Sequence, residues 1–206
     1  MMADRSVHTL DKWGRERLSK SFFLRDFLYS EIAAAHGFCN FPDDVKLAVK
    51  AGRALCENIL EPMQEKFGRI EIRSAFRSAQ VNAYGNEHGF NCASNEANFA
   101  GHIWDRLDKN GHYGATACIV VPRFWDRFYE PHDWKRLAWW VHDHLPYSSM
   151  EFFKPFFAFN ISWHEKPARQ IFNWLETPRW LTKAGMPNNE GSHEFEWSGI
   201  QEIFLS

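Results

Sequence analysis

The sequence lacks the features that mark several large classes of protein. Its N-terminal segment, MMADRSVHTLDKWGRERLSK, contains no apolar run, so it does not resemble a secretory signal. No other stretch is apolar over the length that a membrane-spanning helix needs. The formal net charge of -2 provides no positive field for nucleic acid. We therefore expect synthesis in the cytoplasm and no membrane span or nucleic-acid partner.

Cysteine is scarce, and its spacing excludes a zinc finger. The four cysteines, Cys39, Cys56, Cys92 and Cys118, are scattered along the chain, and without an export signal we expect them to be reduced. Internal repeats and low-complexity segments are also absent, and 206 residues suit one domain. We predict an arm over residues 1–20, a domain over 21–166, and a tail over 167–206 that wraps the domain.

Aromatic residues, in contrast, are abundant. The chain contains 10 tryptophans and 19 phenylalanines. Such large side chains usually build the core, although tryptophan can also line a groove for sugars or for a protein partner. The length allows a substantial core without disulfide bonds.

The hydrophobic pattern predicts a mixture of helices and strands. Helical spacing is found in Leu24–Ala35, in residues 43–66 and in Trp134–His144, whereas alternation indicates strands at Ile70–Ser74, His112–Val121 and Phe157–His164. The turn residues 108–111 predict a further strand before them, at His102–Leu107. The two middle strands are predicted to form a hairpin. This order is typical of an α+β fold, here a small antiparallel sheet with helices packed on one face.

The segment Ile70–Asn82, IEIRSAFRSAQVN, is the most informative stretch. A strand leads into a turn, and Ser78 is suited to cap the helix that follows. Arg73 and Arg77 then lie at the boundary of these elements, where guanidinium groups can bind a carboxylate or a phosphate through two parallel hydrogen bonds. The alternative interpretation is an ordinary surface strand with salt bridges.

This segment and the residues before it resemble a known family, the M15-type zinc DD-peptidases. The family carries a motif of the form hhhSGYRSxxVN, preceded by FxLxEFxxS and hGhxNxP. Here the corresponding segments read FFLRDFLYS (Phe22–Ser30), HGFCNFP (His36–Pro42) and ILEPMQEKFGRIEIRSAFRSAQVN (Ile59–Asn82). The resemblance implies a DD-peptidase-like fold and a groove that binds a peptidoglycan peptide through Arg73, Arg77, Ser78 and Asn82.

The resemblance also implies zinc. The family motif SxHxxGxAxD supplies a histidine and an aspartate, and a WhH element supplies the last histidine. In this chain the ligands suggested by these motifs are His112, Cys118 in place of the aspartate, and His164; a thiolate is a good zinc ligand. The alternatives are His102 with Asp105 as ligands, or Cys118 as an ordinary core residue. A zinc peptidase also needs a general base, for which Glu165 and Glu151 are the nearest candidates.

Two functions from different classes follow. The first is a zinc-dependent peptidase that cleaves peptidoglycan cross-links or D-alanine termini. The second is a binding or structural protein on the same fold that has lost the metal, such as a component of a phage particle. Because no export signal is visible, the first hypothesis expects delivery to the cell wall by a holin or a phage.

Overall fold

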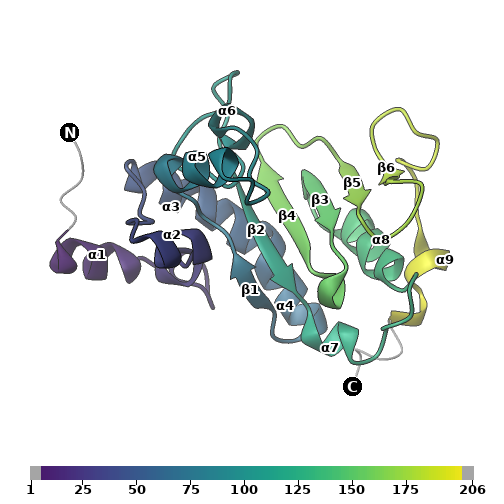
Figure 1. Ribbon diagram of the computed structural model, residues 1–206. Coiled ribbons are helices and arrows are strands. Elements are labelled where there is room, and N and C mark those ends of the chain that lie inside the picture. The colour runs from purple at the N-terminus through teal and green to yellow at the C-terminus, as the bar shows by residue number, and fades with distance from the viewer. Residues whose placement is uncertain (1–5, 201–206) are drawn as a thin grey trace.

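A six-stranded sheet runs through the computed structural model, which describes residues 6–200 (Figure 1). Its strands are β1 (Glu71–Ser74), β2 (Gly114–Val120), β3 (Ser149–Phe152), β4 (Phe159–His164), β5 (Gln170–Asn173) and β6 (Trp180–Thr182), in the order β1-β2-β4-β3-β5-β6. The α+β prediction is confirmed. The expected antiparallel sheet is corrected at one place, because β3 and β5 pair in parallel.

The helices lie mainly before β2 and between β2 and β3. The α-helices are α1 (Val7–Gly14), α2 (Glu31–His36), α3 (Val45–Leu55), α4 (Glu61–Phe67), α5 (Ala79–Glu87), α6 (Asn95–Asn98), α7 (Pro122–Trp125), α8 (Trp134–His144) and α9 (Glu194–Trp197). Two short 3-10 helices, η1 (Leu24–Phe27) and η3 (Pro155–Phe157), and one π-helical turn, η2 (Cys56–Leu60), complete the set.

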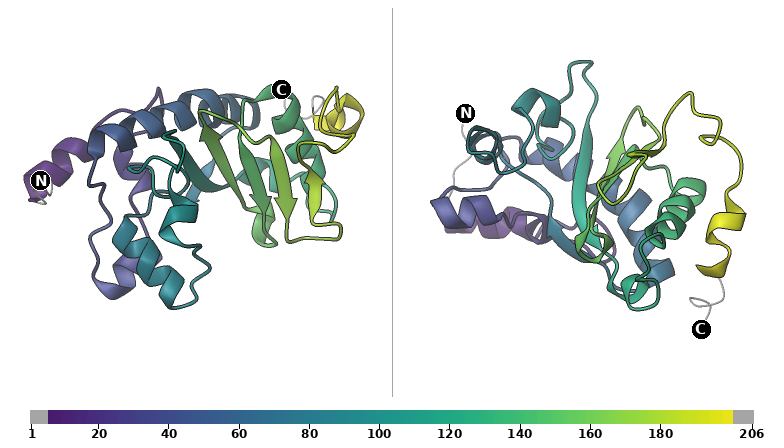
Figure 2. Two further views of the ribbon diagram at one scale, coloured as in Figure 1. Left: turned by 90° about the horizontal axis from the view of Figure 1, so that it is seen from above. Right: turned by 45° about the vertical axis from the view of Figure 1, so that its right-hand side comes forward.

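One face of the sheet is covered by helices and forms the core. The helical run α3–η2–α4 lies across β2 and β4 (Figure 2). Leu55, Ile59 and Met63 on its apolar side are completely buried. Helix α8 belongs to the same core, where Trp134 packs against Phe152 of β3. The opposite face of the sheet is not covered by these helices. Helices α2, α5 and α6 lie beside one end of that face (Figures 1 and 2).

The boundaries of the long helical run follow the local sequence. The side chain of Asp44 accepts a hydrogen bond from the backbone of Leu47, and Gly68 ends the run with a φ of 80° that favours glycine. The wider π turn ends at Leu60, two residues before Pro62, which lacks a backbone N–H for the regular helical bond. The predicted helix over residues 43–66 is thus confirmed, with the helical run extending from Val45 to Phe67.

Several local predictions are wrong. Residues 24–35 form η1 and then α2, because Ser30 caps a new helix through the backbone of Ala33. The segment His102–Leu107 is a series of turns with one isolated bridge, so the predicted hairpin does not form. Its Trp104 is buried and donates to the Thr116 carbonyl, which holds the segment against β2 without strand pairing.

The predicted arm and tail are parts of the folded domain where the structure describes them. In the arm, α1 contacts η1, and Leu18 lies in the core. The tail contributes β5 and β6 to the sheet, and α9 packs on α8. Residues 1–5 and 201–206 of these two segments lie outside the described residues. Within residues 6–200, no helix has both the length and the apolar character needed to cross a membrane.

Candidate functional site

The open face of the sheet is polar. Strand alternation turns Ala115, Ala117 and Ile119 of β2 into the core and leaves Thr116 and Cys118 on the other side. The same alternation places further polar side chains on this open face: Ser149 and Glu151 of β3, Asn160, Ser162 and His164 of β4, and Gln170 of β5. The alternation that predicted strands at His112–Val121 and Phe157–His164 agrees with this arrangement, because it turns every second side chain of β2 and β4 into the core.

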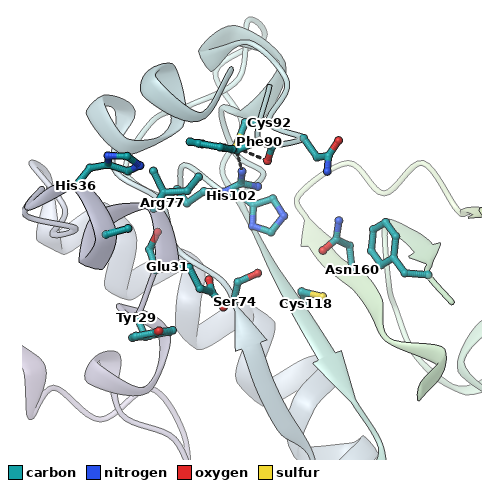
Figure 3. A pocket seen from close by; sticks show the side chains of 15 residues that line it. Tyr29, Glu31, His36, Ser74, Arg77, Phe90, Cys92, His102, Cys118 and Asn160 are labelled. Carbon is teal, nitrogen blue, oxygen red and sulfur yellow. Dashed lines mark hydrogen bonds between the residues drawn. The ribbon is translucent and has the colours of Figure 1, made fainter. Parts of the chain in front are cut away.

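Two adjoining cavities cover this face and form one groove. The first, of about 560 Å³, lies between α2, the loop after α5 and strands β1, β2 and β4. The second, of about 540 Å³, extends over β4, β3 and β5 to β6. His102 and Asn160 line both cavities and mark their boundary. Figure 3 shows both residues in the lining of the first cavity. Both volumes fall in the range of typical small-ligand sites, about 300–1,000 Å³.

His102 is held in a defined orientation at this boundary. Its Nδ1 lies 2.7 Å from the Ala75 carbonyl oxygen, which can only accept, so Nδ1 carries the proton. Burial lowers the pKa of the imidazole to about 3, with the positive charge of Arg77 adding to the effect. The ring is therefore neutral near pH 7. Its other nitrogen, which is unprotonated, is available to the Asn160 side chain and to the groove.

Arg77 brings a positive charge into the first cavity. Its backbone N–H donates to the His102 carbonyl at 2.8 Å, which ties the two residues together, and its Nη1 contacts the Cys92 sulfur. Within residues 6–200, no ion pair with a carboxylate is found for Arg77, although Glu31 lines the same cavity. Figure 3 shows Arg77 and His102 beside each other in the lining of this cavity, with Arg77 joined to Cys92.

The turn that carries Arg77 is fixed by Asn40, which lies in the segment HGFCNFP. The Asn40 amide group donates to the carbonyls of Leu28 and Phe76, at 3.0 and 2.9 Å, and its oxygen accepts the Ser78 N–H at 2.8 Å. A single side chain thus joins three separate parts of the chain around the turn. This gives a structural reason for the segment that precedes the arginine motif.

The other predicted substrate-binding residues do not line the groove, and two of them stabilise the segments next to it. Ser78 is buried and caps α5 through the backbone of Val81. Asn82 is completely buried and donates to the Ala93 carbonyl and to Asn95, which holds the loop after α5. Arg73 lies on β1, does not line either cavity, and acts on the Cys118 thiol only through its charge. Of the four, Arg77 alone lines the groove.

The sheet register separates the predicted zinc ligands. Gly114 pairs with His164, whereas Cys118 pairs with Asn160, so Cys118 and His164 are four residues apart along adjacent strands, or about 13 Å. His112 does lie near His164, with ring centroids 6.0 Å apart, and both face Asp108. The structure thus brings His112 and His164 together but leaves Cys118 beside His102.

The alternative pair, His102 and Asp105, occupies two different environments. The Asp105 carboxylate accepts the Asp43 N–H at 2.7 Å at the start of α3 and contacts Arg106. Burial raises the pKa of Asp105 despite these partners. His102 lines the groove, whereas Asp105 does not.

The two candidates for the general base differ in position. Glu165 lies outside both cavities and accepts the Tyr113 N–H. Glu151 lines the second cavity, but both of its oxygens are engaged: one by Asn160 at 3.1 Å and one by the Trp174 indole at 2.8 Å. Glu151 is therefore part of a network with Asn160 and His102.

A group that could hold a metal ion lies elsewhere, at the end of α8. One ligand atom from each of His142, Asp143 and His193 lies within 4.8 Å of the others. Each histidine nitrogen already has a hydrogen-bond partner: Tyr147 and the Asn189 carbonyl for His142, Asp143 and the Asn188 carbonyl for His193. A metal would have to displace some of these bonds. In the sequence His193 is far from α8, so no spacing signals this group.

Comparisons with known proteins add no relative. A comparison with protein-family models found no match, and comparisons with curated proteins and with solved structures also found none. The interpretation of the groove therefore depends on its own geometry.

Proposed function

We propose that this protein binds a peptide-like ligand with a free carboxylate in the groove, as a binding protein and not as a hydrolase. The observation that carries the proposal is the position of Arg77, which lines the first cavity beside the neutral ring of His102. By analogy with the family that the sequence resembles, the proposed ligand is a peptidoglycan stem peptide that ends in D-alanine. A phage particle is one setting in which such a binding protein would act.

The chemistry of the first cavity suits a carboxylate. A guanidinium group can donate two parallel hydrogen bonds to a carboxylate, and such charge-assisted bonds gain strength when water is excluded. The lone pair of His102 and the oxygen of Ser74 can accept N–H groups of a peptide next to the carboxylate. Since Asn40 fixes the turn, Arg77 is positioned before the ligand arrives.

A zinc centre fits the groove poorly. Catalytic zinc usually takes three protein ligands and an open fourth position. Within residues 6–200, the only three histidine, cysteine or carboxylate ligand atoms close enough together to hold an ion are those of His142, Asp143 and His193, which lie outside the groove. In the groove, burial raises the pKa of the Cys118 thiol to about 11 and so favours its protonated form, and Glu151 is held by two hydrogen bonds.

One observation favours the zinc peptidase as a second candidate. Histidines that bind metals usually donate their other ring nitrogen to a carbonyl or a carboxylate, and His102 donates to Ala75 in this way. If zinc were bound, it would activate a water and polarise a peptide carbonyl. The chain's own contribution would be to orient His102 and to hold the substrate carboxylate at Arg77.

Isothermal titration with N-acetyl-D-Ala-D-Ala tests the binding proposal. We expect binding to the wild type, and the C-terminal amide of the same peptide should bind much more weakly. Arg77→Lys should weaken binding by about tenfold, because the bidentate fork is lost. Arg69→Lys is the matched control, since Arg69 is exposed and pairs with Glu71 outside the groove. Equal affinities of Arg77→Lys and wild type would refute the carboxylate role.

A second measurement separates binding from hydrolysis. Protein purified without chelator is analysed for zinc and is then incubated with purified peptidoglycan. We expect no stoichiometric zinc and no released peptides. One zinc per chain that is lost in His102→Ala, together with cleavage that chelator stops and zinc restores, would overturn the binding-only proposal in favour of the peptidase.

A further inference from the structure

The second cavity has an aromatic wall at its far end. Phe172 lies edge-on to Trp174 and to Trp180, with ring centroids 5.2 and 5.0 Å away. All three rings line the cavity, and Trp174 is 49% exposed. Exposed indole surface gathered in a cavity gains from burial against the apolar face of a ligand. This end therefore offers ring surface to whatever fills the groove.

The floor next to this wall is densely polar. It consists of side chains from strands spaced about 4.8 Å apart, which place hydrogen-bonding groups at regular intervals. The floor residues are Thr116, Ser149, Glu151, Asn160, Ser162 and Gln170. Hydroxyl and amide groups both donate and accept, so this floor can pair with closely spaced groups that also do both.

The charge of the second cavity differs from that of the first. None of the described residues that line the second cavity is a lysine or an arginine. Arg179 and Lys183 instead lie over the rings of Trp174 and Trp180. Glu151 is the carboxylate in this lining, and Asn160 and Trp174 occupy its oxygens. A ligand here is thus expected to be uncharged.

We infer that the second cavity binds a neutral saccharide of two pyranose rings. A pyranose has an apolar C–H face, which an indole ring can cover, and a rim of hydroxyls that donate and accept. These are the complements of the aromatic wall and of the polar floor. The inference deepens the proposed function, because the shared boundary at His102 and Asn160 would let one ligand fill both cavities, with its sugar beside Trp174 and its carboxylate at Arg77.

Titration with N,N′-diacetylchitobiose and with cellobiose tests the saccharide site directly. We expect at least one of them to bind the wild type, and Trp174→Ala to weaken that binding by about tenfold. Trp180→Phe, which keeps an aromatic ring and the fold, should weaken it less. Tyr129→Ala is the control, since Tyr129 is 62% exposed and lies outside both cavities. Far-UV circular dichroism verifies that each variant is folded.

The two sites are distinguished by crossing the ligands and the variants. Arg77→Lys should leave saccharide affinity unchanged, and Trp174→Ala should leave N-acetyl-D-Ala-D-Ala affinity unchanged. Each ligand should also bind in the presence of saturating amounts of the other. Saccharide binding without peptide binding would refute the proposed function but support this inference. The saccharide site is refuted if neither saccharide binds the wild type, or if Trp174→Ala and Trp180→Phe both bind the saccharide with wild-type affinity. Either result refutes it whether or not the peptide binds.

Discussion

Replacing Asp143 with alanine tests whether the C-terminal segment is fastened to α8. The Asp143 carboxylate accepts three hydrogen bonds of 2.7 Å: one from the His193 backbone N–H, one from the His193 ring and one from the Trp197 indole. The side chains of Asp143 and His193 are only 9% and 10% exposed. The substitution leaves three donors without their acceptor in a region that is largely buried.

The expected cost follows from this geometry. Leaving a buried donor without its acceptor typically costs about 1–3 kcal/mol, and we expect about 3 kcal/mol in total for the three donors here because part of the cluster meets solvent. For a chain of this size that lowers the Tm by about 6–12 °C. Asp143→Asn should cost less, since the amide oxygen can still accept from the His193 backbone and from Trp197. Asp126→Ala, at an exposed carboxylate, is the control and should change little.

The effect should depend on pH in a defined direction. Burial alone would raise the pKa of Asp143, but the hydrogen bonds from Trp197 and His193 outweigh it and lower the pKa. A carboxylate whose pKa is lower in the folded than in the unfolded protein stabilises the fold at pH values above its unfolded-state pKa. This stabilisation is lost as the pH falls through its folded-state pKa. The Tm difference between wild type and Asp143→Ala should therefore be full near pH 7 and should shrink below about pH 4.

Thermal melts followed by circular dichroism measure the difference, and hydrogen exchange locates it. Exchange in Asp143→Ala should rise first around His193–Trp197, because that segment loses its attachment. An unchanged Tm near neutral pH, together with unchanged exchange in this segment, would refute the idea that Asp143 fastens the C-terminal part of the chain.

Two further predictions concern the segments that carry the groove residues. In Gly114→Ala the new Cβ would lie 2.8 Å from the Trp163 carbonyl oxygen and even closer to the Ala100 carbonyl oxygen. We therefore expect urea unfolding to show a free energy of unfolding lower by about 3 kcal/mol. Gly199→Ala is the control and should be tolerated, because its new Cβ meets only the flexible end of Arg136. Asn40→Ala should reduce the affinity for N-acetyl-D-Ala-D-Ala in the titration used for Arg77→Lys, although Asn40 does not line the groove. Asn58→Ala is the control and should leave this affinity unchanged, because Asn58 lies on the exposed side of the long helical run. Full affinity in Asn40→Ala would show that the turn needs no such support.

The sequence was sufficient for those elements whose pattern is both strong and local. Helix α8 begins and ends where the helical spacing predicted, and β1, β2 and β4 are adjacent in the sheet with the expected faces. The period of a strand or a helix is a property of neighbouring residues, so one sequence suffices to detect it. The short strands β3, β5 and β6 offer only three or four residues each, too few for a pattern to stand out.

The segment His102–Leu107 shows how a turn signal can mislead. The turn residues 108–111 suggested a strand on either side of them, but Ala100 has a φ of 54°, and the chain turns there. The contacts that hold the segment are distant in sequence: His102 with Ala75, Trp104 with Thr116, and Asp105 with Asp43. Tertiary contacts thus override the local pattern, and no window of sequence contains them.

The composition of the groove could be predicted only in part. Arg77 was recognisable from its position at the end of a strand, whereas Asn160 was not among the predicted site residues, although it lies on the polar face of β4. Arg77 and Asn160 lie close to His102 only in the register in which Cys118 pairs with Asn160, and this register is set by the whole sheet. The same register places His164 away from Cys118, which a motif read along one chain could not reveal.

The network at the end of α8 also bears on the saccharide site, because it anchors both strands that carry the aromatic wall. Arg169, which precedes β5, donates to the carbonyls of His142 and Leu145, and Asn189 donates to the Arg169 carbonyl and to Thr182 in β6. The His142 ring in turn donates to the Asn189 carbonyl.

None of these contacts involves the turn that holds Arg77. If Asp143→Ala loosens the network, it should shift the positions of Phe172, Trp174 and Trp180 while leaving the first cavity unchanged. We therefore expect this variant to bind chitobiose or cellobiose more weakly than the wild type and N-acetyl-D-Ala-D-Ala with unchanged affinity, at a temperature at which it is fully folded. Equal losses for both ligands would instead show that the two cavities respond as one unit.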